Sequence, residues 1–231
     1  MKIGIIGAMA QEVKLLQEHL VNQKTWKKAG ATFYQGMIGD HEITVVQSGI
    51  GKVLASITTS LLIQQYDVDL VINTGSAGGI GQGLAVGDIV IADKLAYHDV
   101  DATVFGYQYG QVPGGMPLYY EANPAFATLM NQAAKETQHQ VKSGLIVTGD
   151  SFIADPTRLA DIIHHFPEAL ACEMEGAAIA QTALQFEVPC LVVRAMSDTA
   201  DHDATISFDA FIELAGKRSA EMVLHFINLC E

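Results

Sequence analysis

The feature that most constrains the fold is the alternation of short apolar, largely β-branched segments with stretches of helical periodicity. Glycine or other small residues commonly separate the two kinds of segment. Alternation of this kind predicts an α/β fold with a largely parallel sheet that is covered on both faces. The apolar segments are 3–8, 42–47, 70–73, 88–92, 144–147 and 189–195, and the helical stretches are 10–21, 52–65, 124–138, 156–165, 175–186 and 207–229.

The 231 residues contain no repeat, low-complexity tract or Ser/Gly-rich linker, so we expect one domain over residues 1–231. Hydrophobic residues make up 49% of the chain, which is enough for a sizeable core. Asn123 before Pro124 and Asp155 before Pro156 are typical of a helix cap followed by proline at the first helical position. Helices are therefore expected to begin at 124 and 156.

Acidic residues outnumber basic ones by 26 to 13, so the formal net charge at pH 7 is −13. Such a field repels nucleic-acid backbones and anionic membrane surfaces. The three arginines, Arg158, Arg194 and Arg218, are few for a site that binds a polyanion. We therefore expect a neutral or cationic small molecule as the partner, with no nucleic acid and no membrane.

Cysteine usage and the N-terminus both favour a cytoplasmic protein. Cys172, Cys190 and Cys230 are odd in number and lack C-x-x-C spacing, which predicts reduced thiols. Residues 1–10 resemble a signal peptide in outline, but their apolar stretch is too short and Glu12 follows closely. The sequence has no apolar run of about 18 residues, the length that would predict a membrane span.

The segments that follow the predicted strands are rich in functional side chains. Ligands of parallel α/β sheets bind beyond the carboxyl ends of the strands, so these side chains are expected to line the site. They are Met9, Glu12, Ser76, Asp150, Ser151, Phe152, Ile153, Glu173, Met174, Glu175, Met196, Ser197 and Asp198.

Three carboxylates on separate segments, Glu12, Glu175 and Asp198, are the candidates for chemistry, and each has an alternative explanation. Glu12 would stabilise the first turn of its helix, and Asp198 would cap a following turn. Glu175 has the same first-turn explanation. Its small, apolar surroundings make an unpartnered carboxylate costly, however, which favours a bound hydroxyl or cation. The place of Asp198 beside Ser197, directly after a buried strand, favours a role facing the ligand.

Arg194 lies inside an apolar segment, where a buried guanidinium requires a carboxylate. We expect it to pair with Glu12 or Glu175. The alternative is an arginine at a strand end that extends into solvent.

The glycine-rich segments do not indicate a nucleotide cofactor. SGIGK at 48–52 lacks the four-residue gap of a Walker A loop, and 75–83 has no G-x-G-x-x-G register. Acidic residues and histidines cluster at 98–101 and 198–203, but neither cluster has a recognised metal-ligand spacing. No cofactor and no metal are predicted.

A set of carboxylates without metal or phosphate-binding arginines suits cleavage of a ribosyl C–N bond. Positive charge develops on the sugar in such reactions, and nearby carboxylates stabilise it. One carboxylate can activate water while a second acid protonates the departing base.

Seven motifs together resemble those of the 5′-methylthioadenosine/S-adenosylhomocysteine nucleosidases, in the order of that family and over essentially the whole chain. The EMEG string alone is shared with nucleoside phosphorylases, whereas the full set is far more specific. The motifs are IGIIGAMAQE at 3–12, SGIGK at 48–52, TGSAGG at 74–79, FGYQYG at 105–110, GDSFI at 149–153, EMEGAA at 173–178 and RAMSD at 194–198.

The resemblance implies a single-domain, phosphorylase/hydrolase-like three-layer α/β sandwich around a mixed, partly barrelled sheet, acting as a homodimer. It implies hydrolysis of methylthioadenosine, S-adenosylhomocysteine and also 5′-deoxyadenosine, with release of adenine. Such a reaction serves methionine salvage and clears by-products of methyl transfer.

The resemblance also implies a role for each site residue. Asp198, steadied by Ser197, would protonate adenine N7, and Glu12 would activate water with Ser76 and Arg194 nearby. Glu175 would bind the ribose hydroxyls. The other expected substrate contacts are Glu173; Met174 on the sugar; Phe152 and Ile153 on adenine; Met9, Ile50 and Phe208 around the thio-substituent; and Ala102, Phe105 and Pro113 from the partner subunit.

Two positions depart from the family pattern, and both would touch the pocket for the 5′ substituent. Ala102 stands where a larger aliphatic residue is usual, and the segment GGM at 114–116 differs from the common loop. These departures bear on substrate preference and leave the expected reaction unchanged.

Three other functions compete with hydrolysis. A purine nucleoside phosphorylase usually has an arginine before the Gly-Ser loop, where Asn73 and Thr74 stand here. A non-catalytic nucleoside sensor would not require an acid and a base together. A Rossmann-type dehydrogenase does not fit the glycine register.

Overall fold

A mixed ten-stranded sheet with helices on both faces forms the protein. The computed structural model describes residues 1–137, 139–200 and 204–230, with the backbone alone for 204–207. The elements are β1 (Lys2–Gly7), α1 (Ala10–Glu18), β2 (Val21–Lys28), β3 (Ala31–Ile38), β4 (His41–Gln47), α2 (Lys52–Tyr66), β5 (Leu70–Gly79), β6 (Ile89–Tyr97), η1 (Thr103–Phe105), β7 (Tyr120–Glu121), α3 (Pro124–Lys135), β8 (Val141–Thr148), α4 (Pro156–His165), β9 (Ala169–Glu173), α5 (Gly176–Gln185), β10 (Cys190–Asp198) and α6 (Ala204–Leu229).

Five strands of the sheet close into a ring. Strand β10 pairs with β5 on one side and β6 on the other, while β8 and β9 complete the circuit from β6 back to β5. Strands β1, β4, β3 and β2 extend the sheet from β5. Five of the ten strand pairings in the described residues are antiparallel, so the expectation of a largely parallel sheet is wrong. The mixed, partly barrelled sheet is confirmed.

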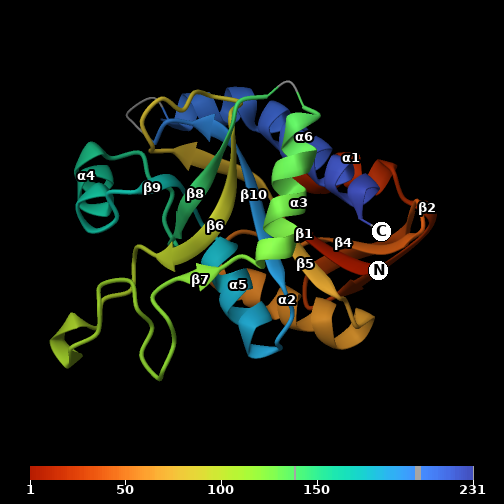
Figure 1. Ribbon diagram of the computed structural model, residues 1–231, viewed down its shortest axis with the longest axis horizontal. Helices are drawn as coiled ribbons and strands as arrows, with labels where there is room; N and C mark the ends of the chain where they lie inside the picture. Colours follow the sequence, from red (N-terminus) through yellow and green to blue (C-terminus); the bar gives the residue numbers. More distant parts are fainter. Residues whose placement is uncertain (138, 201–203, 231) are drawn as a thin grey trace.

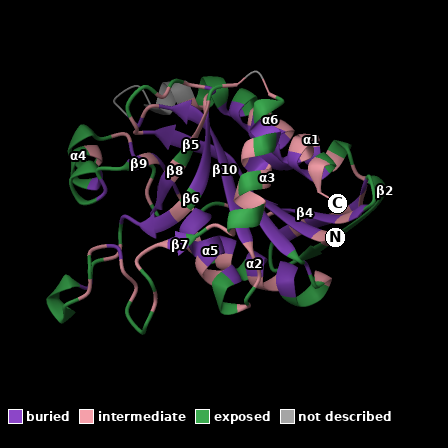
Figure 2. Ribbon diagram, in the orientation of Figure 1, coloured by how far each residue is buried: buried purple, intermediate pink, exposed green. Residues whose placement is uncertain are grey.

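The helices make the outer layers (Figure 1). Helices α2 and α5 pack together on one face, and α1 and α3 pack with α6 on the other. Apolar side chains fill both interfaces, and Figure 2 shows most of the strands buried between them. The three-layer sandwich is therefore confirmed. None of the helices in the described ranges has the length and hydropathy needed to cross a membrane.

Both predicted proline-led helix starts are confirmed. The Asn123 side chain accepts hydrogen bonds from the amides of Ala125 and Phe126 at 3.0 and 3.3 Å, and Asp155 accepts one from Thr157 at 2.8 Å. Each predicted strand and helix overlaps an observed one, with ends that differ by a few residues. Strands β2, β3 and β7 were not predicted. Strand β2 is polar and exposed along most of its length and so lacks an apolar pattern, and β7 has only two residues.

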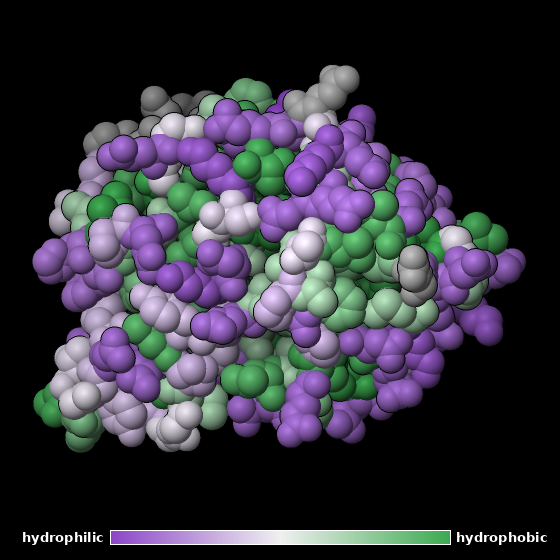
Figure 3. Space-filling view, viewed as in Figure 1, coloured by the Kyte–Doolittle hydropathy of each residue, from purple (hydrophilic) through white to green (hydrophobic). Residues whose placement is uncertain are grey.

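A long irregular arm joins β6 to β7 and extends from the body of the molecule (Figure 1). Its tip carries η1, where the side chains of Val104 and Phe105 are 85% and 80% exposed. Figure 3 shows apolar groups at this tip, although hydrophilic side chains cover much of the face in view. Two exposed apolar side chains at one tip make it a candidate contact surface.

Replacement of Asn123 by alanine should lower the free energy of unfolding by about 1 kcal/mol, because two amides at the start of α3 lose their acceptor. Urea denaturation would measure the change. Asn123→Asp is the control, since aspartate caps equally well, and equal losses in both variants would contradict the capping role.

Candidate active site

A cavity of about 450 Å³ opens at the carboxyl ends of β1, β5, β9 and β10. This volume suits a ligand the size of a nucleoside. The wall combines apolar side chains with a few convergent polar groups. The lining residues are Ala8, Met9, Glu12, Ile50, Ser76, Ala77, Gly78, Ser151, Phe152, Ile153, Cys172, Glu173, Met174, Glu175, Ser197, Asp198 and Phe208.

Glu12 is held at the start of α1 by four hydrogen bonds. One carboxylate oxygen accepts from the amides of Ala8 and Met9 at 2.8 and 3.0 Å. The other accepts from the amide and the hydroxyl of Ser76, at 2.9 and 3.0 Å. Glu12 therefore caps its own helix, as its alternative explanation expects, and also faces the cavity in a fixed orientation.

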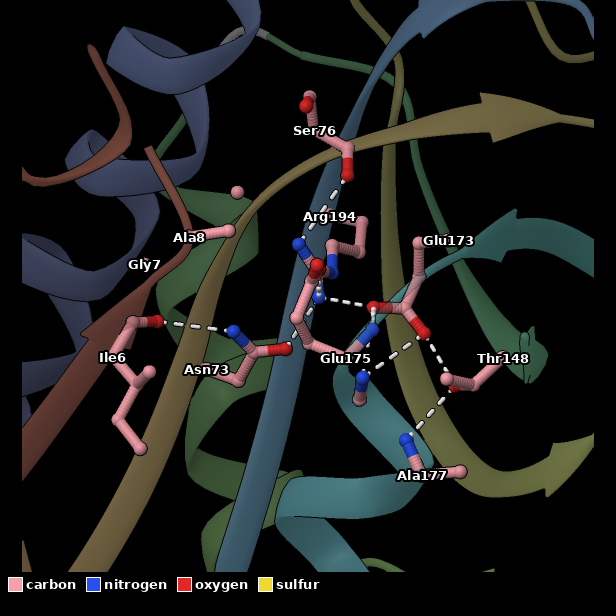
Figure 4. A network of polar contacts seen from close by, with 12 residues as sticks. Ile6, Gly7, Ala8, Asn73, Ser76, Thr148, Glu173, Glu175, Ala177 and Arg194 are labelled. Atoms are coloured by element: carbon pink, nitrogen blue, oxygen red, sulfur yellow. Dashed lines mark hydrogen bonds and ion pairs between the residues drawn. The ribbon is translucent and has the colours of Figure 1, made fainter. Parts of the chain in front are cut away.

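Arg194 lies under the cavity with its side chain 1% exposed. Its guanidinium forms ion pairs with Glu173 and, at 3.3 Å, with Glu175 (Figure 4). It also donates to the side-chain oxygen of Asn73 at 2.6 Å and to the carbonyl of Ser76 at 3.3 Å. The predicted pairing with Glu175 is confirmed, whereas Glu173 takes the place expected for Glu12.

Glu173 connects Arg194 to the start of α5. Its carboxylate accepts from the amides of Glu175 and Gly176 at 3.0 and 2.8 Å, and from the hydroxyl of Thr148. Thr148 in turn accepts from the amide of Ala177 at 2.8 Å (Figure 4). Glu173 thus caps α5 and supplies the charge that Arg194 requires when it is buried.

Glu175 is 4% exposed and has less compensation than Glu173. One oxygen accepts from the Gly51 amide at 2.8 Å and the other from Arg194 at 3.3 Å. Burial raises the pKa of the Glu175 carboxyl to about 7, and Arg194 only partly opposes this effect. Desolvation therefore dominates the titration of this group.

Asp198 ends β10 at the opposite side of the cavity and is 2% exposed. The Ser197 hydroxyl donates to one carboxylate oxygen at 2.8 Å, and the Ala200 amide donates to the other at 2.9 Å. The second contact is the turn cap considered as the alternative, so Asp198 combines a cap with a position in the cavity wall.

Gly75 is the point where β5 passes between two charged groups. A Cβ at this position would lie 2.5 Å from Arg194 Nη1 and 2.6 Å from Glu12 Oε1. Both separations are closer than nonbonded atoms approach, so any side chain here would displace the arginine or the glutamate. Close packing of three elements therefore requires glycine at 75.

The structure brings together thirteen of the predicted site residues in the cavity wall, including Ser151, whereas Asp150 and Met196 do not line it. Arg194 lies beneath them rather than in the wall. Ala102, Phe105 and Pro113 lie on the arm and do not line the cavity of their own chain. The thirteen are Met9, Glu12, Ile50, Ser76, Ser151, Phe152, Ile153, Glu173, Met174, Glu175, Ser197, Asp198 and Phe208.

Sequence reasoning did not assign supporting roles to Asn73, Thr148 and Gly51. Asn73 contacts Arg194, Thr148 contacts Glu173, and Gly51 contacts Glu175. Each contact joins segments that are far apart in the chain, so no local spacing indicates it. Ala8, Ala77, Gly78 and Cys172 of the wall were also missed, although each adjoins or lies near a predicted residue.

The described residues contain no cluster of three or more His, Cys, Asp or Glu side chains able to hold a metal ion. Residues 201–203, which belong to one of the two acidic clusters in the sequence, lie outside the described residues.

Comparisons with known proteins agree on one family. Residues 2–228 match the family described as Phosphorylase superfamily. A protein of Exiguobacterium sp. named 5′-methylthioadenosine/S-adenosylhomocysteine nucleosidase is 50% identical over 225 residues, which cover 97% of this chain and 96% of that relative.

Solved structures give the same answer. The S. pneumoniae nucleosidase of the same name, with the transition-state inhibitor MT-ImmA, has a TM-score of 0.96 and 50% identity over all of both chains. The Neisseria meningitidis enzyme in complex with methylthio-immucillin-A has a TM-score of 0.96 and 44% identity, with 98% of each chain covered.

The raised pKa of Glu175 predicts a dependence of stability on pH. Its stabilising contribution should be complete below the ordinary value of 4.5 and lost as the pH rises through about 7. A Glu175→Gln variant lacks this titration. Urea unfolding of both proteins between pH 4.5 and 8 should show the wild type losing up to about 3 kcal/mol relative to the variant, at about 1.4 kcal/mol per pKa unit. Parallel curves would contradict the assignment.

Proposed function

Because the chain belongs to the phosphorylase superfamily and, within it, to the family of 5′-methylthioadenosine/S-adenosylhomocysteine nucleosidases, we propose that it hydrolyses the N-glycosidic bond of both nucleosides. The products are adenine and the corresponding thioribose, and 5′-deoxyadenosine is a further substrate. The observation that carries the proposal is the convergence of Glu12, Glu175 and Asp198, all buried, on a single cavity.

Asp198 is the proposed general acid. When the bond between ribose C1′ and adenine N9 breaks, its electron pair moves to the base, and a proton delivered to N7 makes adenine a better leaving group. The hydrogen bond from Ser197 fixes the orientation of the carboxyl group. In this role Asp198 carries its proton when substrate binds.

Glu12 is the proposed general base. It accepts a proton from water while the water oxygen bonds to C1′, so one water molecule is consumed for each bond cleaved. Its four hydrogen bonds hold the carboxylate in one orientation, and Ser76 provides two of them. Positioning of this kind lowers the barrier, since the reactants do not have to find the correct geometry by chance.

The remaining wall residues suit the parts of the substrate. Glu175 accepts hydrogen bonds from the ribose hydroxyls, and Met174 packs on the sugar. Phe152 stacks on adenine while the Ile153 backbone binds its edge. Met9, Ile50 and Phe208 surround the thio-substituent, and the rings of Phe152 and Phe208 already meet edge to face with centroids 5.5 Å apart.

Two alternatives fit the site less well. A phosphorylase must bind phosphate, yet the described residues of the wall include no lysine or arginine, and Arg194 is occupied by carboxylates. A nucleoside sensor that only binds its ligand does not require a general base, whereas four hydrogen bonds hold Glu12 in one orientation in the cavity. Hydrolysis accounts for both features.

We also propose a homodimer in which each arm completes the other subunit's cavity. Ile50 at the rim is 53% exposed, and Val53 on the adjoining face of α2 is 68% exposed. An apolar arm tip from a second copy would cover this surface. Phe105 and Pro113 of the partner subunit are the proposed contacts, whereas Ala102 is buried within its own arm and contributes less.

We further propose that residues 1–231 form a single domain and that the protein is cytoplasmic. A single sheet joins all the described strands, which supports residues 1–231 as one nucleosidase domain. The three cysteines are free thiols, two of them buried, which suits the reducing cytoplasm.

Adenine release from methylthioadenosine should not depend on phosphate, because no lysine or arginine among the described wall residues could bind it. The sugar product should be free methylthioribose, measured by chromatography with and without 50 mM phosphate (about physiological ionic strength or below). Formation of a sugar 1-phosphate, or a rate that rises with phosphate, would support the phosphorylase instead.

Glu12→Gln should lower kcat at least ~10²-fold with KM little changed, because glutamine keeps the shape of the side chain but cannot accept the proton. Glu18→Gln, on the exposed side of the same helix, is the matched control and should keep full activity. A Glu12→Gln enzyme at half the wild-type rate would mean that another group is the base.

Loss of the arm contact should affect assembly and catalysis together. Phe105→Ala is expected to weaken dimerisation and to raise KM, as measured by sedimentation velocity and by initial rates across a dilution series. Val21→Ser removes another exposed apolar group, 60% exposed on β2, and should change neither. A monomer that is fully active at nanomolar concentration would rule out the shared cavity.

A further inference from the structure

Ser219 on α6 is a buried hydroxyl that joins three elements beside the active site. It is fully buried, accepts a hydrogen bond from the Gly75 amide at 3.0 Å and donates to the Val193 carbonyl at 3.1 Å. The Thr74 hydroxyl lies 2.6 Å away. Since a hydroxyl has one proton and Ser219 gives it to Val193, Thr74 is the donor in that contact. All the bonding capacity of Ser219 is therefore used to fix β5 and β10 against α6.

The backbone that Ser219 holds is next to the groups assigned to chemistry. Gly75 precedes Ser76, whose amide and hydroxyl hold Glu12, and Val193 precedes Arg194. Gly75 also packs directly between Glu12 and Arg194, because a Cβ there would overlap both side chains. A shift of this backbone would be transmitted to the orientation of the Glu12 carboxylate.

The same face of α6 supports Glu12 from a second direction. A Cβ on Gly216, three residues before Ser219, would lie 2.7 Å from the Gln11 carbonyl oxygen and 3.3 Å from Glu12 Cα. Helix α6 thus touches the backbone that carries Glu12 and binds the strand that carries its hydrogen-bond donor. One helix face sets the position of both partners.

We propose that Ser219 is a positioning residue for the hydrolytic reaction, acting through Gly75 and Ser76 on Glu12. The inference rests on the proposed role of Glu12 as the base. A purely structural role would require only that Ser219 satisfy buried backbone groups. A positioning role requires in addition that loss of Ser219 lower the rate at which bound substrate is hydrolysed. Displacements of about 1 Å at a catalytic group reduce rates up to ~10²-fold.

The test compares Ser219→Ala with Thr59→Val. Thr59 is equally buried, but its hydroxyl donates to the Ala55 carbonyl within α2, outside the site. Both variants lose a buried hydroxyl, which makes three hydrogen bonds in Ser219 and one in Thr59, and thermal melting will measure the stability that each variant loses. Ser219→Ala is expected to lower kcat ~10-fold with KM within about twofold of wild type, whereas Thr59→Val keeps wild-type kcat. Equal kcat values in the two variants would overturn the proposal.

A second variant covers the case in which Ser219→Ala does not fold. Thr74→Val removes the hydroxyl that donates to Ser219 and leaves Ser219 itself in place, so a smaller loss of kcat is expected, again with KM little changed. If Ser219→Ala does not fold and Thr74→Val has an unchanged kcat, the proposal is overturned.

An NMR measurement separates this inference from the proposed function. Exchange of the Gly75 amide hydrogen with solvent should be faster in Ser219→Ala than in wild type, because the variant lacks the acceptor of that amide, whatever the enzyme acts on. A wild-type protein that releases no adenine would contradict the proposed function. Gly75 exchange that is no faster in the variant would overturn the Ser219 inference separately.

Discussion

The buried ion pairs of Arg194 are the interaction on which the rest of the structure depends. A guanidinium removed from water costs several kcal/mol unless carboxylates and hydrogen bonds compensate it. Here the compensation comes from Glu173, Glu175 and Asn73, which belong to the β9–α5 segment and to β5. Strand β10, which carries Arg194, pairs with both β5 and β6. The contacts of the Arg194 guanidinium therefore link β10 to β5 and to the β9–α5 segment beneath the cavity.

The distribution of charge around Arg194 accounts for the chemistry that the cavity suits. Burial raises the pKa of Glu175 to about 7, and little compensation for this burial remains because Glu173 is committed to Arg194 and to the start of α5. Glu12 and Asp198 have separate sets of hydrogen-bond donors. Carboxylates outnumber the single guanidinium, and such a site stabilises the positive charge that forms on a sugar when its bond to a base breaks.

The sequence predicted that three carboxylates would lie together, because strand ends meet at one edge of a sheet. Glu12, Glu175 and Asp198 could each be placed after an apolar segment, and all three line the cavity. The same reasoning did not reveal the closure of β10 onto both β5 and β6, because strand pairing between distant segments leaves no local pattern.

The partner of Arg194 shows the same limit on a smaller scale. Glu12 was a reasonable candidate by position, but backbone amides at the start of α1 and the Ser76 donors already occupy its carboxylate. Only the three-dimensional arrangement shows that Glu173 is closer and available. Ser219 was not a candidate at all, since a serine inside a long apolar helix has no distinguishing spacing.

The measurement that tests the account most directly is the rate of adenine release by Asp198→Asn in a single turnover, beside Asp155→Asn as control. Each aspartate accepts a hydrogen bond from the amide two residues later, at 2.9 and 2.8 Å, and asparagine can retain that cap. The account predicts a rate at least ~10²-fold lower for Asp198→Asn, with a melting temperature near wild type, and a normal rate for Asp155→Asn. Comparable rates in both variants, or early melting of Asp198→Asn, would contradict the assignment of Asp198 as the acid.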